Sequence, residues 1–475
     1  MQCASSSSDP EPRSARRPYR CPHGLSVLAL LMLASVGSVA RSADQILIAG
    51  HVAQFDAAGK LLPWIDWPTA LERELSFYRQ APQDHGYPRF VSETFLDGEW
   101  RPDPARLDTI PATQNGMGII SYLKLYARSD AHAESELAIA RTMGDYLLHE
   151  SLTPGGGTYP RFTRSTGMRG QFPLAADAGS ESDQAYEIEP DKGGIAGYAL
   201  LLLYRVTHEA GYLDQALHNA RVLAAHQARG DATHSPWPFR VDYRTGLGRG
   251  PVSSNMSYIL RLYDALLAQG YREFRTPRLL LWRWIKTYQI PSAATQGLLF
   301  AQFFEDHDAP GNRNAWAPLN LARYLLEEQA ALDPDWRADA QTLVQFVRRS
   351  FTHQEFGITV CHEQDEDLDA WGGVNSTYGA VLALYAKAIN SPELADEARR
   401  ALNFTLYSID EQGRPRDLFK HPAAGGWQED AHTDVIHNFL DALQAFPAWA
   451  DAPATAPAAV APRIVSSWPN AGRGA

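Results

Sequence analysis

KGGIAGYALLLLY, which runs from Lys192 to Tyr204, is the most informative stretch of this 475-residue chain. It is apolar around most of the circumference of a helix, as is typical of a helix buried on all sides. Five comparable stretches follow or precede it: NGMGIISYLKLY at Asn115, NMSYILRLY at Asn255, NAWAPLNLARYLL at Asn314, NSTYGAVLALY at Asn375 and DVIHNFLDAL at Asp434. The spacing of their starts predicts a repeat of about sixty residues, built around one buried helix.

A second, amphipathic helix is expected behind each of the first five buried helices. In residues 391–409, for example, Leu394, Ala398 and Leu402 keep to one stripe at helical spacing. The turn inside each pair is short, whereas the connection to the next buried helix is long, on the order of 20 to 40 residues. All long connections enter buried helices at their N-terminal ends, so we expect them to gather at one end of the domain. Helix N-termini carry partial positive charge and favour an anionic group there.

The sixth buried helix lacks such a partner, because the chain turns to Pro and Ala after Phe446. A helical segment at residues 68–80, with Leu71 and Leu75 on one stripe, precedes the first unit and has no other assigned place. In a closed ring this segment would pack outside the sixth buried helix, with both leucines touching residues 435–443. An open solenoid would instead leave an apolar face exposed at each end.

The N-terminus has the organisation of a signal peptide. Residues 1–24 are polar and contain four arginines, residues 25–34 are apolar, and small residues occupy positions 38–40. The apolar run is too short to span a bilayer, so we expect an exported protein, periplasmic or secreted, with no integral membrane span after cleavage. A retained membrane anchor is the alternative.

Loss of residues 1–40 removes four Arg, one Asp and one Glu, which takes the net charge from -12 to -14. An acidic chain without a basic stripe is not expected to bind nucleic acid. Cys361 is then the single cysteine, so neither an internal disulfide nor a cysteine zinc site is expected.

The domain layout follows from these patterns. Length alone would favour two or three domains, but no Ser/Gly-rich or Pro-rich linker interrupts residues 110–448. We expect a lead segment at 41–110 that includes the ring-closing helix, one ring of six helical hairpins at 111–449, and a disordered Ala/Pro tail at 450–475.

Six buried helices, each paired with an amphipathic helix and with long connections at one end, resemble the six-hairpin (α/α) toroid superfamily. That superfamily includes many secreted glycoside hydrolases, polysaccharide lyases and uronyl epimerases. The resemblance covers residues from about 68 to 448 and implies an all-α, closed (α/α)6 toroid with its active site at the funnel mouth. Terpene cyclases and prenyltransferases have similar barrels, but the acidic run at 366–369 matches their Asp-rich motif poorly, and their Gln-Trp repeats are absent.

The connection before the third buried helix, WPFRVDYRTGLGRGPVSSN, is the densest candidate for a site. Trp237 offers a stacking surface for a sugar, and Arg240 and Arg244 suit a carboxylate held by paired hydrogen bonds. Asp242 and Tyr243 are residue types that transfer protons. The alternative is a packed loop in which the arginines pair with acids and the aromatics fill space.

Other candidates lie at the starts of the buried helices. Glu187, Asp191 and Lys192 arrive together at the second, where acids also stabilise a helix through its dipole. Asn255 and Asn375 open two more, and N-capping is the simpler explanation for both.

The sixth buried helix places Asp434 and His437 three residues apart on one face. A core histidine satisfied by a carbonyl is the ordinary alternative. The alternating acids at 365–369 lack the Gly and Glu of an EF-hand, so a solvated acidic loop is favoured over a calcium site.

We expect an enzyme that cleaves glycosidic bonds in a poly- or oligosaccharide, without metal or cofactor. Hydrolysis would use two carboxylates, Asp191 and Asp242 first, with Glu187 and Asp434 in reserve. Elimination at a uronic acid would use a Tyr or His base and Arg or Lys to neutralise the carboxylate. The catalytic candidates are Asp191, Asp242, Tyr243 and His437, and the candidates for binding a neutral or acidic sugar are Lys192, Trp237, Arg240, Arg244, Asn255, Tyr258, Trp371 and Asn375. A non-catalytic glycan-binding toroid and an isoprenoid cyclase are the alternatives.

Overall fold

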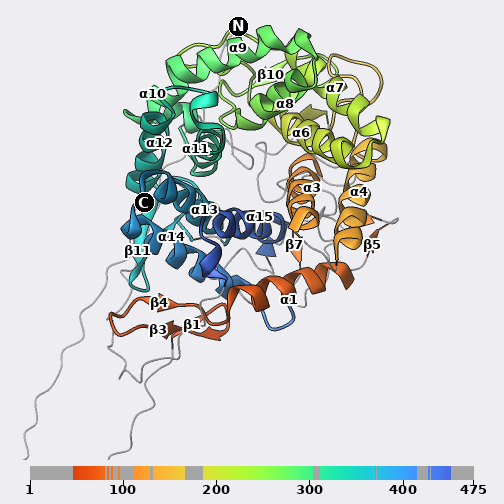
Figure 1. Ribbon diagram of the computed structural model, residues 1–475. Helices are drawn as coiled ribbons and strands as arrows, with labels where there is room; N and C mark the ends of the chain where they lie inside the picture. The colour runs from red at the N-terminus through yellow and green to blue at the C-terminus, as the bar shows by residue number, and fades with distance from the viewer. Residues whose placement is uncertain are drawn as a thin grey trace, which may run out of the picture. The chain divides into compact units, whose positions relative to one another are not determined.

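Six inner helices follow the six apolar stretches of the sequence. They are α3 (Pro111–Arg128), α6 (Pro190–Thr207), α8 (Ser257–Ala268), α11 (Trp316–Glu328), α13 (Gly372–Ile389) and α15 (Glu429–Ala445). Each contacts the next around the ring, and α15 contacts α3, so the ring is closed (Figure 1). The expected all-α architecture of six hairpins is confirmed.

The computed structural model describes part of the chain, and all described residues belong to one unit that begins at Gln45. The described residues are 46–80, 83–84, 87–88, 95–96, 111–128, 132–165, 186–302, 311–366, 368–370, 372–414, 426–427 and 429–450. The expected signal peptide, the expected tail beyond 450 and Trp371 lie outside them. No helix within these ranges is both long and apolar enough to cross a membrane.

Glycines set the spacing between neighbouring inner helices. A Cβ atom on Gly116 of α3 would lie 2.7 Å from Ile195 Cγ2 of α6, and one on Gly194 of α6 would lie 2.6 Å from Ile259 Cγ1 of α8. Only glycine permits this approach, which explains why small residues recur in the apolar stretches.

Five outer helices each contact the inner helix that precedes them in the chain. They are α4 (Ala133–His149), α7 (Ala210–Ala225), α9 (Arg275–Trp284), α12 (Trp336–Ser350) and α14 (Pro392–Thr405). The helix α9 continues through a π-helical segment, η3 (Ile285–Gln289), into α10 (Ile290–Ala293). Each outer helix buries one stripe; in α12 that stripe includes Ala340, Leu343 and Val347.

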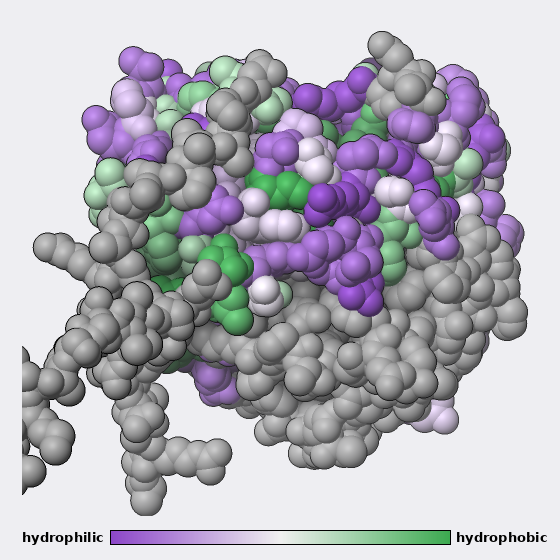
Figure 2. All heavy atoms as spheres, turned by 90° about the horizontal axis from the view of Figure 1, so that it is seen from below, coloured by the Kyte–Doolittle hydropathy of each residue, from purple (hydrophilic) through white to green (hydrophobic). Residues whose placement is uncertain are grey.

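The sixth outer position belongs to α1 (Trp67–Gln80), as the closed ring requires (Figure 1). The Trp67 ring packs edge-on against Phe439 of α15, with ring centres 4.7 Å apart. Leu75 is buried in the same hydrophobic core as Phe439, and Leu71 packs against that core. Figure 2 views the molecule from the side of α1, where the described surface is mainly hydrophilic with scattered apolar spots. The buried residues of α1, which include Ala70, Leu75 and Tyr78, place its apolar stripe on the core side.

Short strands and 3-10 turns lie in the connections and in the lead segment. A second small core holds the hairpins of the lead segment, including Ile48 and Leu61, against Val360 and Phe404. The antiparallel pairs are β1 (Leu47–Ile48) with β2 (His51–Val52), β3 (Gln54–Phe55) with β4 (Leu61–Leu62), β5 (Gln83–Asp84) with β6 (Tyr87–Pro88), β7 (Phe95–Leu96) with β13 (Gly426–Trp427), and β11 (Thr352–Glu355) with β12 (Ile358–Cys361). The 3-10 turns are η2 (Arg272–Phe274), η4 (Leu298–Phe300), η5 (Gln329–Ala331), η6 (Leu406–Ser408) and η7 (Pro447–Trp449).

Candidate functional site

Two long connections join in one small sheet beside the N-terminal ends of α6 and α8. Its strands are β8 (Glu187–Ile188), β9 (Arg240–Asp242) and β10 (Gly248–Arg249), in the antiparallel order β10-β9-β8. The connection before α6 supplies β8, and the connection before α8 supplies the other two strands. The pairing sets Glu187 opposite Asp242 and Arg249 opposite Arg240. The expected gathering of long connections is therefore observed for these two.

The arginines in and beside this sheet pair with acids in and beside it. Arg249 donates to both carboxylate oxygens of Glu187, at 3.0 and 2.6 Å. Arg244 Nη2 donates to Asp242 Oδ2 at 2.7 Å, and its guanidinium lies 3.4 Å from the centre of the Tyr186 ring. This is the packed-loop arrangement that the sequence left as the alternative.

The Arg244 hydrogen bond lowers the pKa of Asp242 to about 2. A carboxyl group that is ionised at neutral pH cannot donate a proton as a general acid. In hydrolysis Asp242 therefore fits only the ionised partner, the base or nucleophile, and not the acid.

Three other candidates are buried in roles that hold the fold together. The Trp237 indole is fully buried and donates to the Leu223 carbonyl oxygen at 3.1 Å, so no ring face is open to a sugar. Arg240 is also fully buried, 3.5 Å from Glu189. Tyr243 is buried, with the Arg164 guanidinium 5.7 Å from the centre of its ring.

The two asparagines also differ from the expected N-caps. Asn375 lies inside α13, where its side-chain oxygen accepts from the Cys361 N–H and its amide nitrogen donates to the Cys361 carbonyl, both at 2.8 Å. Asn255 precedes α8 and accepts a hydrogen bond from the Ser257 hydroxyl at 3.1 Å. Both amides fix long connections to the starts of inner helices.

A buried acid-lysine cluster occupies the start of α6. Lys192 Nζ lies 3.1 Å from Asp191 Oδ2 and 3.5 Å from Glu189 Oε2. Burial alone would lower the pKa of Lys192, but Asp191 and Glu189 outweigh it and raise this pKa, so the ammonium stays charged. Asp191 Oδ1 is buried without a hydrogen-bond partner, so Asp191 keeps one oxygen available.

The second polar cluster lies between the inner helices, around Asp441 of α15. Lys124 of α3 forms an ion pair with Asp441. His437 Nε2 and Arg323 Nε, from α15 and α11, lie 3.4 and 3.5 Å from Asp441 Oδ2. We call these four residues the axial cluster. The sequence indicated only His437 among them.

Neighbouring side chains fix the geometry of the axial cluster. Asn438 accepts a hydrogen bond from Arg323 and donates to the hydroxyls of Ser376 and Thr377 of α13, at 2.7 and 2.9 Å. Arg261 of α8 pairs with Glu327 of α11 at 2.6 Å. Residues from α3, α8, α11, α13 and α15 therefore meet in this region.

Several buried polar atoms of the axial cluster lack a hydrogen bond. They are both ring nitrogens of His437, Arg323 Nε and Asp441 Oδ2. Buried polar atoms are paired in the great majority of cases. Within the described part of the chain, this concentration of open donors and acceptors marks a place for water or for polar atoms of a ligand.

The electrostatics of the axial cluster suit a proton acceptor. Burial first, and then the charges of Lys124 and Arg323, hold the pKa of His437 well below 6.5, so the imidazole is neutral at neutral pH. Burial alone would raise the pKa of Asp441, but the charges of Lys124 and Arg323 outweigh it and lower this pKa. The cluster can therefore accept a proton at His437 and stabilise negative charge beside Arg323 and Lys124.

Tyr258 lies at the start of α8 and donates to Met117 Sδ of α3 at 3.0 Å. Burial raises the pKa of Tyr258, so its hydroxyl keeps its proton and is a donor rather than a base. Asp434 is buried one turn before His437 on α15.

The basic residues of this region could have been recognised in the sequence, because they are charged residues inside apolar helical stretches. Lys124, Arg261 and Arg323 each interrupt an otherwise apolar stretch, in the first, third and fourth repeats. A charge inside a helix buried on all sides needs a partner across the ring. That requirement points to Asp441 and Glu327, the acids of the neighbouring helices.

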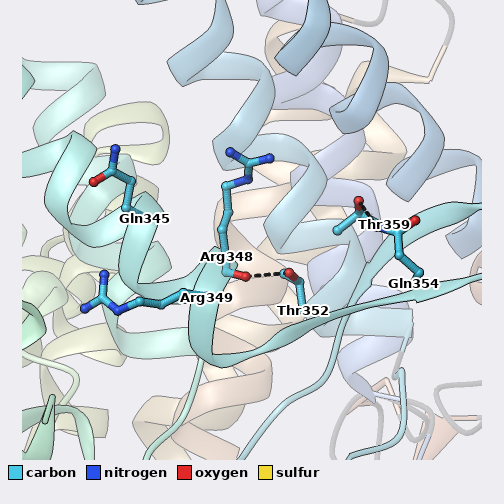
Figure 3. Close-up of a pocket in the computed structure, with 6 residues that line it drawn as sticks. All are labelled: Gln345, Arg348, Arg349, Thr352, Gln354 and Thr359. Carbon is cyan, nitrogen blue, oxygen red and sulfur yellow. Dashed lines mark hydrogen bonds between the residues drawn. The ribbon is translucent and has the colours of Figure 1, made fainter.

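A depression of about 440 Å3 lies on the outside of the ring, between α12 and the β11–β12 hairpin (Figure 3). Its two cations are engaged: Arg348 pairs with Glu397 at 2.8 Å, and Arg349 donates to the Ala293 carbonyl. It is not part of the axial cluster. The lining residues are Gln345, Arg348, Arg349, Thr352, Gln354 and Thr359.

The acidic loop at 363–369 holds an ion pair. Asp365 accepts two hydrogen bonds from Arg313, at 2.7 and 2.8 Å. Among the residues with described placement, no group of three His, Cys, Asp or Glu side chains could hold a metal ion.

Comparison with known proteins agrees with the fold. No protein-family model and no curated protein sequence matches the chain. Among solved structures it resembles a cellobiose 2-epimerase from Spirochaeta thermophila, with 15% identity, a TM-score of 0.57, and 80% of this chain and 97% of that chain covered. It also resembles a D-mannose isomerase, with 12% identity, a TM-score of 0.56, and 79% and 97% covered.

A family 76 glycoside hydrolase from Bacteroides thetaiotaomicron is similar as well, with 12% identity, a TM-score of 0.54, and 79% of this chain and 77% of that chain covered. These likenesses confirm the resemblance to the (α/α)6 toroid superfamily at the level of the fold.

Proposed function

We propose that this chain is a carbohydrate-active enzyme that removes a proton from a sugar carbon at the axial cluster. One observation carries the proposal: a neutral, buried His437, with no hydrogen bond at either ring nitrogen, lies within an ion network that includes Asp441, Arg323 and Lys124. Proton abstraction beside a carbonyl or carboxylate group builds negative charge on oxygen, and fixed cations stabilise it. The sugar epimerase and isomerase among the similar toroids are consistent with such chemistry.

The residues of the cluster have distinct roles in this proposal. His437 accepts the proton, and Asp441, 3.4 Å from its Nε2, stabilises the imidazolium that forms. Arg323, whose Nε has no hydrogen bond and lies 3.5 Å from Asp441 Oδ2, stabilises the developing oxyanion. Return of the proton to the other face of the carbon gives an epimer. Loss of an oxygen substituent β to the carbanion cleaves a glycosidic bond, as in elimination at a uronic acid.

Hydrolysis is less well supported by the described carboxylates. It requires one acid with a raised pKa and a second carboxylate at a defined distance. The pKa values of Asp242 and Asp441 are lowered, and Asp191 lies beside a charged lysine. Likewise, a purely glycan-binding toroid has no need for an unpaired buried histidine, and a cyclase would need a dry aromatic cavity rather than a charged one.

A screen in deuterium oxide tests this function. We would incubate the protein with reducing mono- and disaccharides and with uronic acid polymers, and follow the products by NMR and ultraviolet absorbance. Deuterium at a sugar carbon without chain cleavage indicates epimerisation or isomerisation, and an unsaturated, absorbing product indicates elimination. Release of reducing ends with neither signal would reject proton abstraction in favour of hydrolysis.

We also propose that the protein is exported, on the strength of the N-terminal pattern alone. Sequencing of the mature N-terminus should find a start close to residue 41. A mature protein that retains residues 1–40 would reject export by cleavage.

A further inference from the structure

We propose that Gln289, in the π-helical turn of the outer ring, is a positioning residue for the α8 side chains that reach the axis. The inference rests on the proposed function, because it assigns Gln289 a role in the same site. Gln289 belongs to none of the groups considered above, and no feature of its sequence suggests more than a surface helix.

The π-helical turn changes which side of the outer helix faces the core. The Ile290 N–H donates to the Ile285 carbonyl, five residues back, rather than to the usual fourth residue. Such a turn accommodates one extra residue and rotates the residues beyond it, and it often occurs at functional positions. Here Gln289 becomes buried, with 1% of its surface exposed.

The buried amide of Gln289 joins two of the long connections. Its Nε2 donates to the Ser254 carbonyl at 2.7 Å, in the connection before α8. The same nitrogen donates to the Leu299 carbonyl at 3.2 Å, in the connection before α11. One side chain thereby links two main-chain segments, and at Ser254 it adds to the hydrogen bond that the same carbonyl accepts from the Met256 N–H at 3.2 Å.

Ser254 is also bound from other directions. Asn314 Nδ2 donates to the Ser254 hydroxyl oxygen at 3.1 Å, and the Ser254 N–H donates to the Gln302 carbonyl at 3.3 Å. The Gln302 backbone has a φ of 55°, in the left-handed region that residues other than glycine rarely adopt. The surroundings therefore define the position of Ser254 closely, and Gln289 is the contact that comes from the outer ring.

Ser254 lies at the end of the connection that leads into α8. The helix starts three residues later, at Ser257, and its first turns carry Tyr258 and Arg261. Tyr258 reaches α3 through Met117, and Arg261 reaches α11 through Glu327. A displacement of Ser254 would move both side chains, and misplacement by about 1 Å is enough to slow a reaction by up to a hundredfold.

Gln289→Met tests the inference, because methionine has a similar shape and lacks the amide donors. We expect kcat to fall at least tenfold while KM changes less than threefold, and the amides of residues 252–258 to exchange faster with deuterium. Gln227→Met is the matched control: Gln227 lies just after α7, at the opposite end of this connection from Ser254, and donates to the Pro277 carbonyl of α9 at 3.1 Å. It should leave kcat and exchange at residues 252–258 unchanged.

Two outcomes would overturn the positioning role. One is unchanged exchange at 252–258 in Gln289→Met. The other is faster exchange spread over the whole chain together with a lowered Tm, which would indicate a merely structural role. Hydrogen exchange needs no substrate, so a protein inactive on every sugar would reject the proposed function and leave the exchange result to decide on Gln289.

Discussion

Individual charged side chains inside the ring distinguish this protein from a toroid stabilised by apolar packing alone. Lys124, Arg323 and Asp441 are ionised residues within helices that are otherwise apolar. Burial of a charge is costly unless a partner and hydrogen bonds compensate. Here the ion pairs with Asp441 and the hydrogen bond from Arg323 to Asn438 offset part of this cost, and His437 avoids it by staying neutral.

The neutral state of His437 predicts how stability depends on pH. Its pKa in the folded protein is well below 6.5, whereas an unfolded histidine titrates near 6.5. The stabilisation that His437 gives by staying neutral is therefore fully present above about pH 6.5. As pH falls from there toward the folded pKa, the free energy of unfolding decreases by up to about 1.4 kcal/mol per pH unit. Urea unfolding of the wild type between pH 8 and pH 5 should show this slope.

His437→Gln should have a shallower slope over the same range. His362, whose pKa is lowered to about 4, mainly by burial, contributes in the same direction, but it is present in both proteins. The difference between the two slopes therefore reports on His437. Equal slopes would mean that His437 titrates normally in the folded state.

Sequence reasoning found part of the site and missed the rest for a definite physical reason. His437 was indicated because its helix was recognised. Arg240 was assigned to a substrate because its partner, Glu189, lies in a different connection, as does Glu187, the partner of Arg249. Pairing across fifty or sixty residues depends on the fold, and no local pattern in the sequence shows it.

Among the elements, the inner helices were predictable and the connections were not. Continuous apolar character identifies a buried helix of α6 or α13 without reference to its neighbours. The β8–β10 sheet has strands of two or three residues, too short for alternation to be visible. The π-helical turn at 285–289 depends on packing beyond it, and helix periodicity alone predicts an ordinary helix there.

Because α6 and α8 are closely packed, one added methyl group at Gly194 should lower the free energy of unfolding markedly. In Gly194→Ala, the new Cβ would lie 2.6 Å from Ile259 Cγ1 and 3.0 Å from its backbone nitrogen. We expect a loss of about 1 to 3 kcal/mol in the free energy of unfolding. Gly211→Ala is the matched control in an outer helix, where the nearest atom is 3.5 Å away.

Urea unfolding measures both variants. The control should be neutral or more stable by up to about 1 kcal/mol, because alanine favours helix. A stable Gly194→Ala protein would show that α6 and α8 are not packed as closely as described.

The whole molecule depends on closure of the ring by α1. Besides its contact with Phe439, Trp67 donates from Nε1 to Asn403 Oδ1 of α14 at 2.8 Å, and Arg79 pairs with Glu136 of α4 at 2.6 Å. The N-terminal helix therefore joins the last hairpin to the first. Closure was predictable from the sequence by counting helices, because the sixth inner helix had no partner.

Removal of the Trp67 side chain should destabilise the whole ring. Trp67→Ala is expected to cost roughly 3 to 5 kcal/mol in the free energy of unfolding, as for other buried tryptophans. Leu247→Ala, at a side chain that is 74% exposed, should change it by less than about 0.5 kcal/mol. Similar small effects of both substitutions would mean that α1 does not close the ring.

The rate at which solvent deuterium enters a sugar carbon tests most directly whether the axial cluster transfers protons. On a sugar found active in the screen, solvent deuterium incorporation at carbon should fall by roughly a hundredfold or more in His437→Gln, with Tm measured in parallel. His234→Gln, in an exposed turn, should keep the wild-type rate. Near-normal incorporation by a folded His437→Gln protein would contradict the account.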